Sequence, residues 1–191
     1  MNNLKEMKRK ELFLALIVGA IALFSFLALT FHAFKMTEDT ELALALAGYS
    51  SIGSMTNMNA FNLIEHLGDF TGVYKMYAWL DVAALIGSII AIGYFVYALL
   101  NKNPEDRIAI YKKVILIAIA ISIFMFIQGF HLTDKTNDNF WMGVEMGGTD
   151  PSTLKALGDF GYETEGYWPI IITSALVIGY WLVDKKLPED Q

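Results

Sequence analysis

The stretch LFLALIVGAIALFSFLALTF, residues 12–31, decides the kind of fold, because it contains no charged side chain over twenty residues. A helix rises about 1.5 Å per residue, so a run of this length covers about 30 Å, the thickness of a bilayer's hydrocarbon core. A helix on the surface of a soluble domain needs a polar face toward water, and this stretch has no such face. We therefore predict a membrane-spanning helix.

Three further runs of the same kind follow, the first of which carries one acid, Asp81, near its start. The four predicted spans are residues 12–32, 79–100, 114–131 and 168–183. Two outer loops, residues 35–77 and 132–167, join them and are too short to form a water-soluble core of their own. Residues 1–191 are thus predicted to form a single membrane domain, an all-α integral membrane protein with a four-helix transmembrane bundle.

The basic residues predict the orientation of the spans. Ten of the fourteen lysines and arginines fall before the first predicted span, between the second and third, or after the fourth. Such residues accumulate on the cytoplasmic side of a membrane. We therefore expect a multi-pass protein of the plasma (inner) membrane with its N- and C-termini in the cytoplasm.

Acidic residues follow the opposite distribution. Thirteen lie in the outer loops or at the start of the second span, against four lysines, and the whole chain carries a formal charge of −6. An acidic outer face repels nucleic acid and attracts cations or basic protein surfaces. The chain has no cysteine, so disulfides and thiolate metal sites are absent.

The two halves of the chain repeat short motifs in the same order. FKMTEDT at residues 34–40 corresponds to FHLTDKT at 130–136, and LGDF occurs at both 67–70 and 157–160. Each half contains two spans, so both halves enter the membrane in the same direction. We predict two parallel-repeated helical hairpins, residues 11–100 and 113–184.

The outer loops contain signals for short amphipathic helices. Asn59 is a helix-capping residue, and Gly68 is placed to end the helix in a left-handed conformation. Asp150 and Gly158 flank a second such segment. The predicted short helices cover residues 41–47, 60–67 and 151–157. Within the spans, Gly87, Gly93 and Gly179 are predicted to allow close helix contacts.

Polar residues gather near the outer ends of the predicted spans. The candidate ion or proton site consists of His32, Asp81, Gln128 and His131. A carboxylate within a span needs water or a partner, and His32 or His131 is the expected partner of Asp81. The alternative is that Asp81 lies one turn inside the interface and reaches water unaided.

Methionines and histidines in the outer loops raise the question of a metal. A copper site would draw on Met55, Met58, His66, Met142 and Met146. Thioether and imidazole ligands suit Cu(I), whereas methionine also forms adaptable apolar surface for packing or protein binding. Haem between His32 and His131 is weakly supported, since both lie at span ends. We favour the packing and binding interpretation and predict no cofactor.

Apolar residues of the outer loops form the predicted interaction surface. They are Phe61, Ile64, Phe70, Trp141, Leu154 and Phe160. Because no grouping of side chains favours catalysis, we expect a non-enzymatic membrane subunit whose outer loops dock other membrane or cell-surface proteins, or a second copy of the chain. The alternatives are a small cation or proton transporter or channel, and a copper- or haem-associated subunit of a membrane oxidoreductase.

The arrangement of four spans and two outer loops is similar to that of claudins and tetraspanins. Both families carry cysteine motifs in their loops, and this chain has no cysteine. The resemblance is therefore limited to the architecture.

Overall fold

Four long helices form the frame of the protein. The computed structural model describes residues 9–46, 57–101 and 103–187. The long helices are α1 (Arg9–Leu27), α4 (Gly72–Leu100), α5 (Pro104–Met146) and α7 (Tyr167–Lys186). Within the described ranges, these are the four helices long and apolar enough to cross a membrane, α1 together with its extension to Thr30. The prediction of a helical, multi-pass membrane protein is confirmed.

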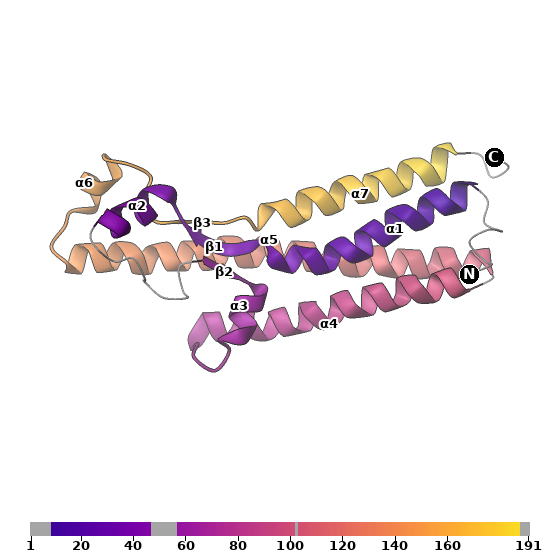
Figure 1. Cartoon of the computed structure of the whole chain (residues 1–191), viewed down its shortest axis with the longest axis horizontal. Helices are drawn as coiled ribbons and strands as arrows, with labels where there is room; N and C mark the ends of the chain where they lie inside the picture. The colour runs from indigo at the N-terminus through magenta and orange to yellow at the C-terminus, as the bar shows by residue number, and fades with distance from the viewer. Residues whose placement is uncertain (1–8, 47–56, 102, 188–191) are drawn as a thin grey trace.

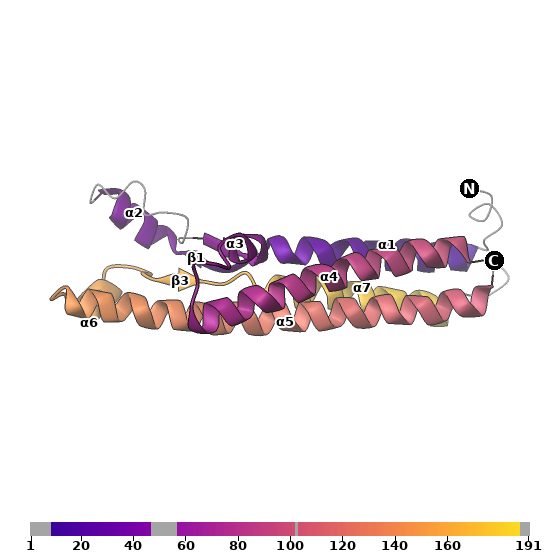
Figure 2. The same ribbon diagram turned by 90° about the horizontal axis from the view of Figure 1, so that it is seen from below.

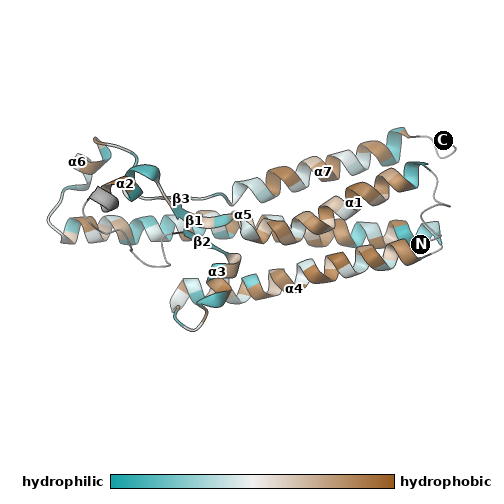
Figure 3. Ribbon diagram, viewed as in Figure 1, coloured by the Kyte–Doolittle hydropathy of each residue, from teal (hydrophilic) through white to brown (hydrophobic). Residues whose placement is uncertain are grey.

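The helices run side by side along the long axis of the molecule (Figures 1 and 2). α1 and α5 contact each other, and each of them also contacts α4 and α7. The core between them contains the fully buried Val18, Ala91, Val114 and Ala118. Small and β-branched side chains at these positions let the helices approach closely. Apolar residues predominate along the bundle, and polar ones concentrate at its two ends (Figure 3).

The described residues beyond one end of the bundle form a second structural unit, which we call the head (residues 31–46, 57–71 and 132–166). Its centre is a three-stranded antiparallel sheet of order β2-β1-β3. The strands are β1 (His32–Met36), β2 (Asn57–Asn59) and β3 (Tyr162–Glu163). β1 and β2 belong to the first outer segment and β3 to the second. The sheet, which was not predicted, therefore joins the two segments.

Three short helices complete the head. They are α2 (Glu38–Leu46), α3 (Ala60–Glu65) and α6 (Pro151–Lys155), and a single 3₁₀ turn, η2 (Ala28–Thr30), ends the first span. The three predicted loop helices are therefore present, within a few residues of the expected bounds. Asn59 caps α3 as predicted, accepting a hydrogen bond from the backbone N–H of Asn62.

The predicted left-handed stops at Gly68 and Gly158 are wrong. The described glycines with positive φ are Gly72, Gly148 and Gly161. α3 ends at Glu65, and its C-terminal cap is His66, whose φ is −96°. The turn that follows is closed by a hydrogen bond of 2.9 Å from the Asp69 N–H to the His66 carbonyl, so no left-handed residue is needed there.

α5 continues well beyond the predicted end of the third span at residue 131. It has 43 residues and extends about 65 Å, twice the thickness of a hydrocarbon core. The segment after residue 131 is polar but contains no glycine or proline before Gly143, so nothing ends the helix. The first part of the predicted second outer loop is therefore helical, and it forms an arm of α5 within the head.

The repeat has only partial structural counterparts. α1 and α5 start at the same end of the bundle and run in the same direction (Figure 1). The matching motifs differ in structure, however, because residues 34–36 belong to β1 and residues 130–136 belong to α5. The two-hairpin repeat stays a prediction from the sequence.

Candidate functional site

Asp81 and Gln128 meet in the core of the bundle. Gln128 Nε2 donates a hydrogen bond of 2.8 Å to Asp81 Oδ2, linking α4 to α5. Both residues are 0% exposed. The remaining oxygens, Asp81 Oδ1 and Gln128 Oε1, are buried and have no hydrogen-bond partner. Of the four residues predicted to form an ion or proton site, these two contact each other.

The two predicted histidine partners of Asp81 bond elsewhere. His32 Nδ1 lies 2.9 Å from Glu165 Oε2. His131 Nδ1 lies 2.8 Å from the hydroxyl of Tyr77. The expectation that a histidine pairs with Asp81 is therefore wrong, and so is the alternative that Asp81 reaches water unaided. The physical reason is that the head covers this end of the bundle, with Ala60 of α3 packed into the same apolar cluster as Met125.

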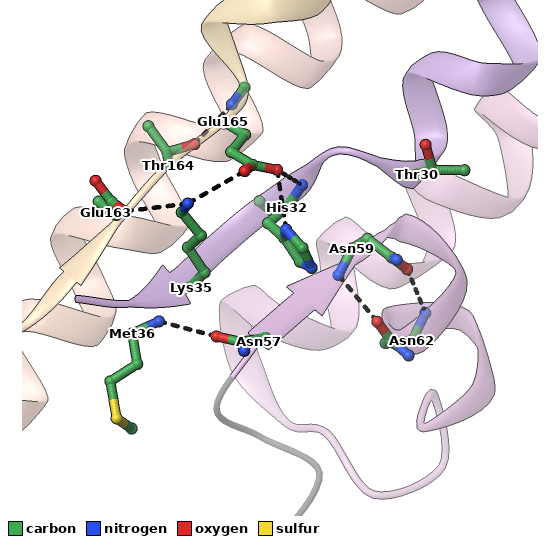
Figure 4. A network of polar contacts seen from close by, with 12 residues as sticks. Thr30, His32, Lys35, Met36, Asn57, Asn59, Asn62, Glu163, Thr164 and Glu165 are labelled. Atoms are coloured by element: carbon green, nitrogen blue, oxygen red, sulfur yellow. Dashed lines mark hydrogen bonds and ion pairs between the residues drawn. The ribbon is translucent and has the colours of Figure 1, made fainter. Parts of the chain in front are cut away.

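Glu165 is the centre of an ionic network in the head (Figure 4). Its Oε2 accepts the backbone N–H of His32 at 3.2 Å, and its Oε1 lies 3.2 Å from Lys35 Nζ. Lys35 also pairs with Glu163 at 3.1 Å. Burial raises the pKa of Glu165, but the hydrogen bonds from His32 and Lys35 outweigh burial and lower this pKa below its ordinary value. The bonds to Glu163 and Glu165 raise the pKa of Lys35.

A second network fixes α2 against the segment before β3. The Thr37 N–H donates to the Gly161 carbonyl at 3.0 Å, and the Gly161 N–H donates to Thr40 Oγ1 at 2.7 Å. The Asp159 N–H donates to Asp39 Oδ2 at 2.7 Å. Gly161 has a φ of +125°, which favours glycine. These bonds join segments 120 or more residues apart.

Asn137 ties the same segment to α5. Its Oδ1 accepts the Tyr162 N–H at 2.7 Å, and its Nδ2 donates to the Tyr162 carbonyl at 2.9 Å. The head is therefore a single body in which α2, the sheet and the arm of α5 are linked by hydrogen bonds. Sequence reasoning missed Glu165, Lys35, Thr40 and Asn137, because their partners are far away in the chain and no local spacing marks them.

The predicted interaction surface is only partly exposed. Phe70 is buried and stacks on Tyr74 with ring centroids 5.9 Å apart, so its placement on that surface was wrong. Phe61 packs against Phe26. Trp141 lies beneath the Lys155 ammonium, 4.7 Å from the ring centroid. Ile64, Leu154 and Phe160 are half-buried.

Other apolar side chains, at the far end of the head, are more exposed. We call them the tip residues. They are Leu42 (60% exposed), Met142 (59%), Met146 (76%) and Leu157 (74%). They belong to α2, to the end of α5 and to the turn after α6, which lie at the same end of the molecule (Figure 1). The tip residues Met142 and Met146 stand one helical turn apart on α5.

The methionines of the predicted copper site do not converge. Met58 is fully buried in an apolar cluster with Leu132, and Met142 lies about 15 Å further along α5. His66 pairs with Asp69 at 3.3 Å. Met55 lies outside the described residues. Within the part of the chain that the structure describes, no group of three or more His, Cys, Asp or Glu side chains could hold a metal ion.

The opposite end of the bundle has its own ion pairs. Arg107 of α5 bonds to Glu11 of α1 at 3.1 Å, and Lys10 lies 3.7 Å from Asp184 of α7. Arg107 is buried despite its charge. These contacts hold the basic end of three spans together.

Comparisons of the chain with models of known protein families, with curated proteins and with solved structures found no match. The function must therefore be inferred from the geometry of the chain itself.

Proposed function

We propose that this chain is a non-enzymatic membrane subunit whose head is a docking or assembly platform in a larger membrane or cell-surface complex. The observation that supports this most is the set of tip residues, four large apolar side chains exposed at the end of an ordered body. Flexible, polarizable methionines among them suit a protein-binding surface.

The length of α5 puts the tip residues beyond the reach of lipid. If the third span ends near residue 131, Met146 lies about 22 Å further along the helix. The polar interface of a bilayer adds only about 5–8 Å on each side of the hydrocarbon core. Lipid then cannot cover these side chains, whereas a protein partner can.

The charge of the head favours a partner with basic residues around an apolar centre. Asp134, Asp138, Glu145 and Asp159 are exposed on the arm of α5 and beside α6. Charges at the rim of an interface steer the encounter and select the partner more than they add affinity. Because the basic ends of the spans lie opposite, we propose that the head faces away from the cytoplasm.

Purification from the native membrane tests this proposal. The tagged chain is extracted in mild detergent, and copurifying proteins are quantified by mass spectrometry. The double variant Met142→Gln, Met146→Gln keeps helix-forming side chains of similar size. We expect the amount of partner that copurifies with it to be at least tenfold lower than with the wild type. The matched control is Met76→Gln, which changes a 49% exposed methionine near the start of α4 and should retain the partner. A lone monomer, or full retention of the partner by the double variant, would contradict the proposal.

A further inference from the structure

Asp81 is a buried carboxyl group without a charged partner. Its one described hydrogen bond comes from Gln128, a neutral amide. The nearest titratable side chains on α4 and α5 are Tyr77 and His131, which bond to each other. Those of the other elements packed at this end also bond elsewhere: His32 with Glu165, and His66 with Asp69. α1 has no titratable side chain at this level, and Tyr167, the first residue of α7, is 37% exposed and packs against Trp168.

The surroundings of the pair are apolar on both sides. One turn inward along the two helices lie Ala84 and Met125, in an apolar cluster with Leu29. One turn outward lie Ala78 and Leu132, in a cluster with Met58. An ionised carboxylate with a single hydrogen bond is strongly disfavoured in such a place, because burial removes its water.

The Asp81–Gln128 pair has more hydrogen-bond acceptors than donors. Asp81 Oδ1 and Gln128 Oε1 are both acceptors, and both lack a donor. The existing hydrogen bond joins Gln128 Nε2 to Asp81 Oδ2. Oδ1 belongs to the same carboxyl group as Oδ2, and Oε1 belongs to the same amide group as Nε2, so the two unpaired oxygens lie on groups that already contact each other. One proton on Oδ1 turns it into a donor toward Oε1, so that both unpaired oxygens take part in a hydrogen bond.

We propose that Asp81 binds a proton at neutral pH and shares it with Gln128 in a carboxylic acid–amide pair with two hydrogen bonds. The pair links α4 to α5 without placing a charge in the bundle. This inference is independent of the docking proposal, because it concerns the core and not the head.

A proton fits the site better than a metal cation. Ca²⁺ takes about six or more oxygen ligands, and Mg²⁺ needs near-octahedral coordination. Among the described residues, the pair offers two free oxygens between apolar layers, and no group that could hold a metal ion is present. A proton needs one atom to bind and one acceptor, which the pair supplies.

Infrared spectroscopy of the full chain in lipid vesicles tests the proposal. A protonated carboxyl group has a C=O stretching band that shifts in D₂O, and a carboxylate does not have this band. We expect the band in the wild type at neutral pH and its absence in Asp81→Asn. The control Asp134→Asn removes an exposed carboxylate and should keep the band. Absence of the band from the wild type at neutral pH would overturn the proposal.

A titration of the wild type covers the case in which Asp81→Asn does not fold. Loss of the band only above neutral pH supports a shared proton, and loss below neutral pH refutes it. Where the variant folds, we expect Asp81→Asn to unfold within a few degrees of the wild type, because an asparagine–glutamine pair reproduces both hydrogen bonds. A large loss of thermal stability in this variant would instead show that the charge of Asp81 is needed.

Discussion

Gly166, the residue before α7, lies so close to the backbone of α5 that adding one methyl group there is predicted to lower the stability of the protein. A Cβ at Gly166 would lie 2.7 Å from the Met125 carbonyl oxygen and 3.1 Å from Gly129 Cα. Both neighbours are backbone atoms of α5, so no change of rotamer can relieve the collision. Gly166→Ala should therefore force the start of α7 away from α5.

The size of the effect follows from overpacking. Extra methyl groups in packed cores cost about 1–3 kcal/mol, and rigid backbone on the opposing side puts Gly166→Ala near about 3 kcal/mol. Gly166 precedes the first turn of α7, so alanine gains little helix propensity there. For Gly129→Ala, inside α5, a gain of about 1 kcal/mol in propensity offsets part of the clash with Thr164 and Gly166.

Gly93→Ala and Gly179→Ala are the matched controls. Both glycines lie inside long helices, and a Cβ there meets nothing within 4 Å. We expect these variants to be neutral or up to about 1 kcal/mol more stable. Reversible unfolding in mixed detergent micelles, followed by circular dichroism, ranks the four variants. If Gly166→Ala were as stable as Gly93→Ala, the packing of α5 against α7 described above would be incorrect.

Three further predictions concern the head and the basic end. Glu165→Gln should lower the stability of the head by about 1 kcal/mol, because ionic bonds of a partly exposed side chain are weak. The measurement is amide hydrogen exchange in β1, which should become faster. Because the pKa of Glu165 is lowered in the folded protein, the carboxylate stabilises the fold. This stabilisation is complete at pH values above the ordinary carboxyl pKa, and it is lost as the pH falls through the lowered pKa. Asn59→Ala should cost about 1 kcal/mol and speed amide exchange in α3, whereas unchanged exchange would count against the cap. Arg107→Gln should lower the unfolding temperature more than Lys112→Gln, an exposed control on the same helix, and equal effects would argue against the Glu11 bond.

The spans and loop helices could be predicted because their signals are local. An uncharged run of twenty residues, and an asparagine before an apolar stripe, are visible without knowing what they contact. The sequence does not predict the continuation of α5, because a change from apolar to polar residues marks the end of a membrane span but not the end of a helix. His131 and Asp134 favour water over lipid as surroundings, but both residues are compatible with a continuing helix.

The rest depends on partners that are distant in the sequence. β3 has two residues and exists only because β1 lies beside it: Tyr162 pairs with Met36, which is 126 positions earlier in the chain. Gln128 could be recognised as polar, but not as the residue that meets Asp81 on another helix. Likewise, the closest contacts between the long helices involve Gly19, Gly129 and Gly166, which were not predicted. Of the three predicted glycines, Gly87 contacts Ile117 and Ile121 of α5, whereas a Cβ at Gly93 or Gly179 would meet nothing within 4 Å.

Photocrosslinking at the tip of the head in native membranes tests the central proposal most directly. A photoreactive phenylalanine analogue replaces Met142, and in a parallel variant it replaces Leu116, which is 68% exposed on the apolar part of α5. The docking account predicts a crosslink from position 142 to a defined polypeptide. The mass of the product distinguishes another protein from a second copy of the chain. Position 116, the control, is expected to react with lipid. If position 142 yields no crosslinked polypeptide while position 116 labels lipid normally, the account is contradicted.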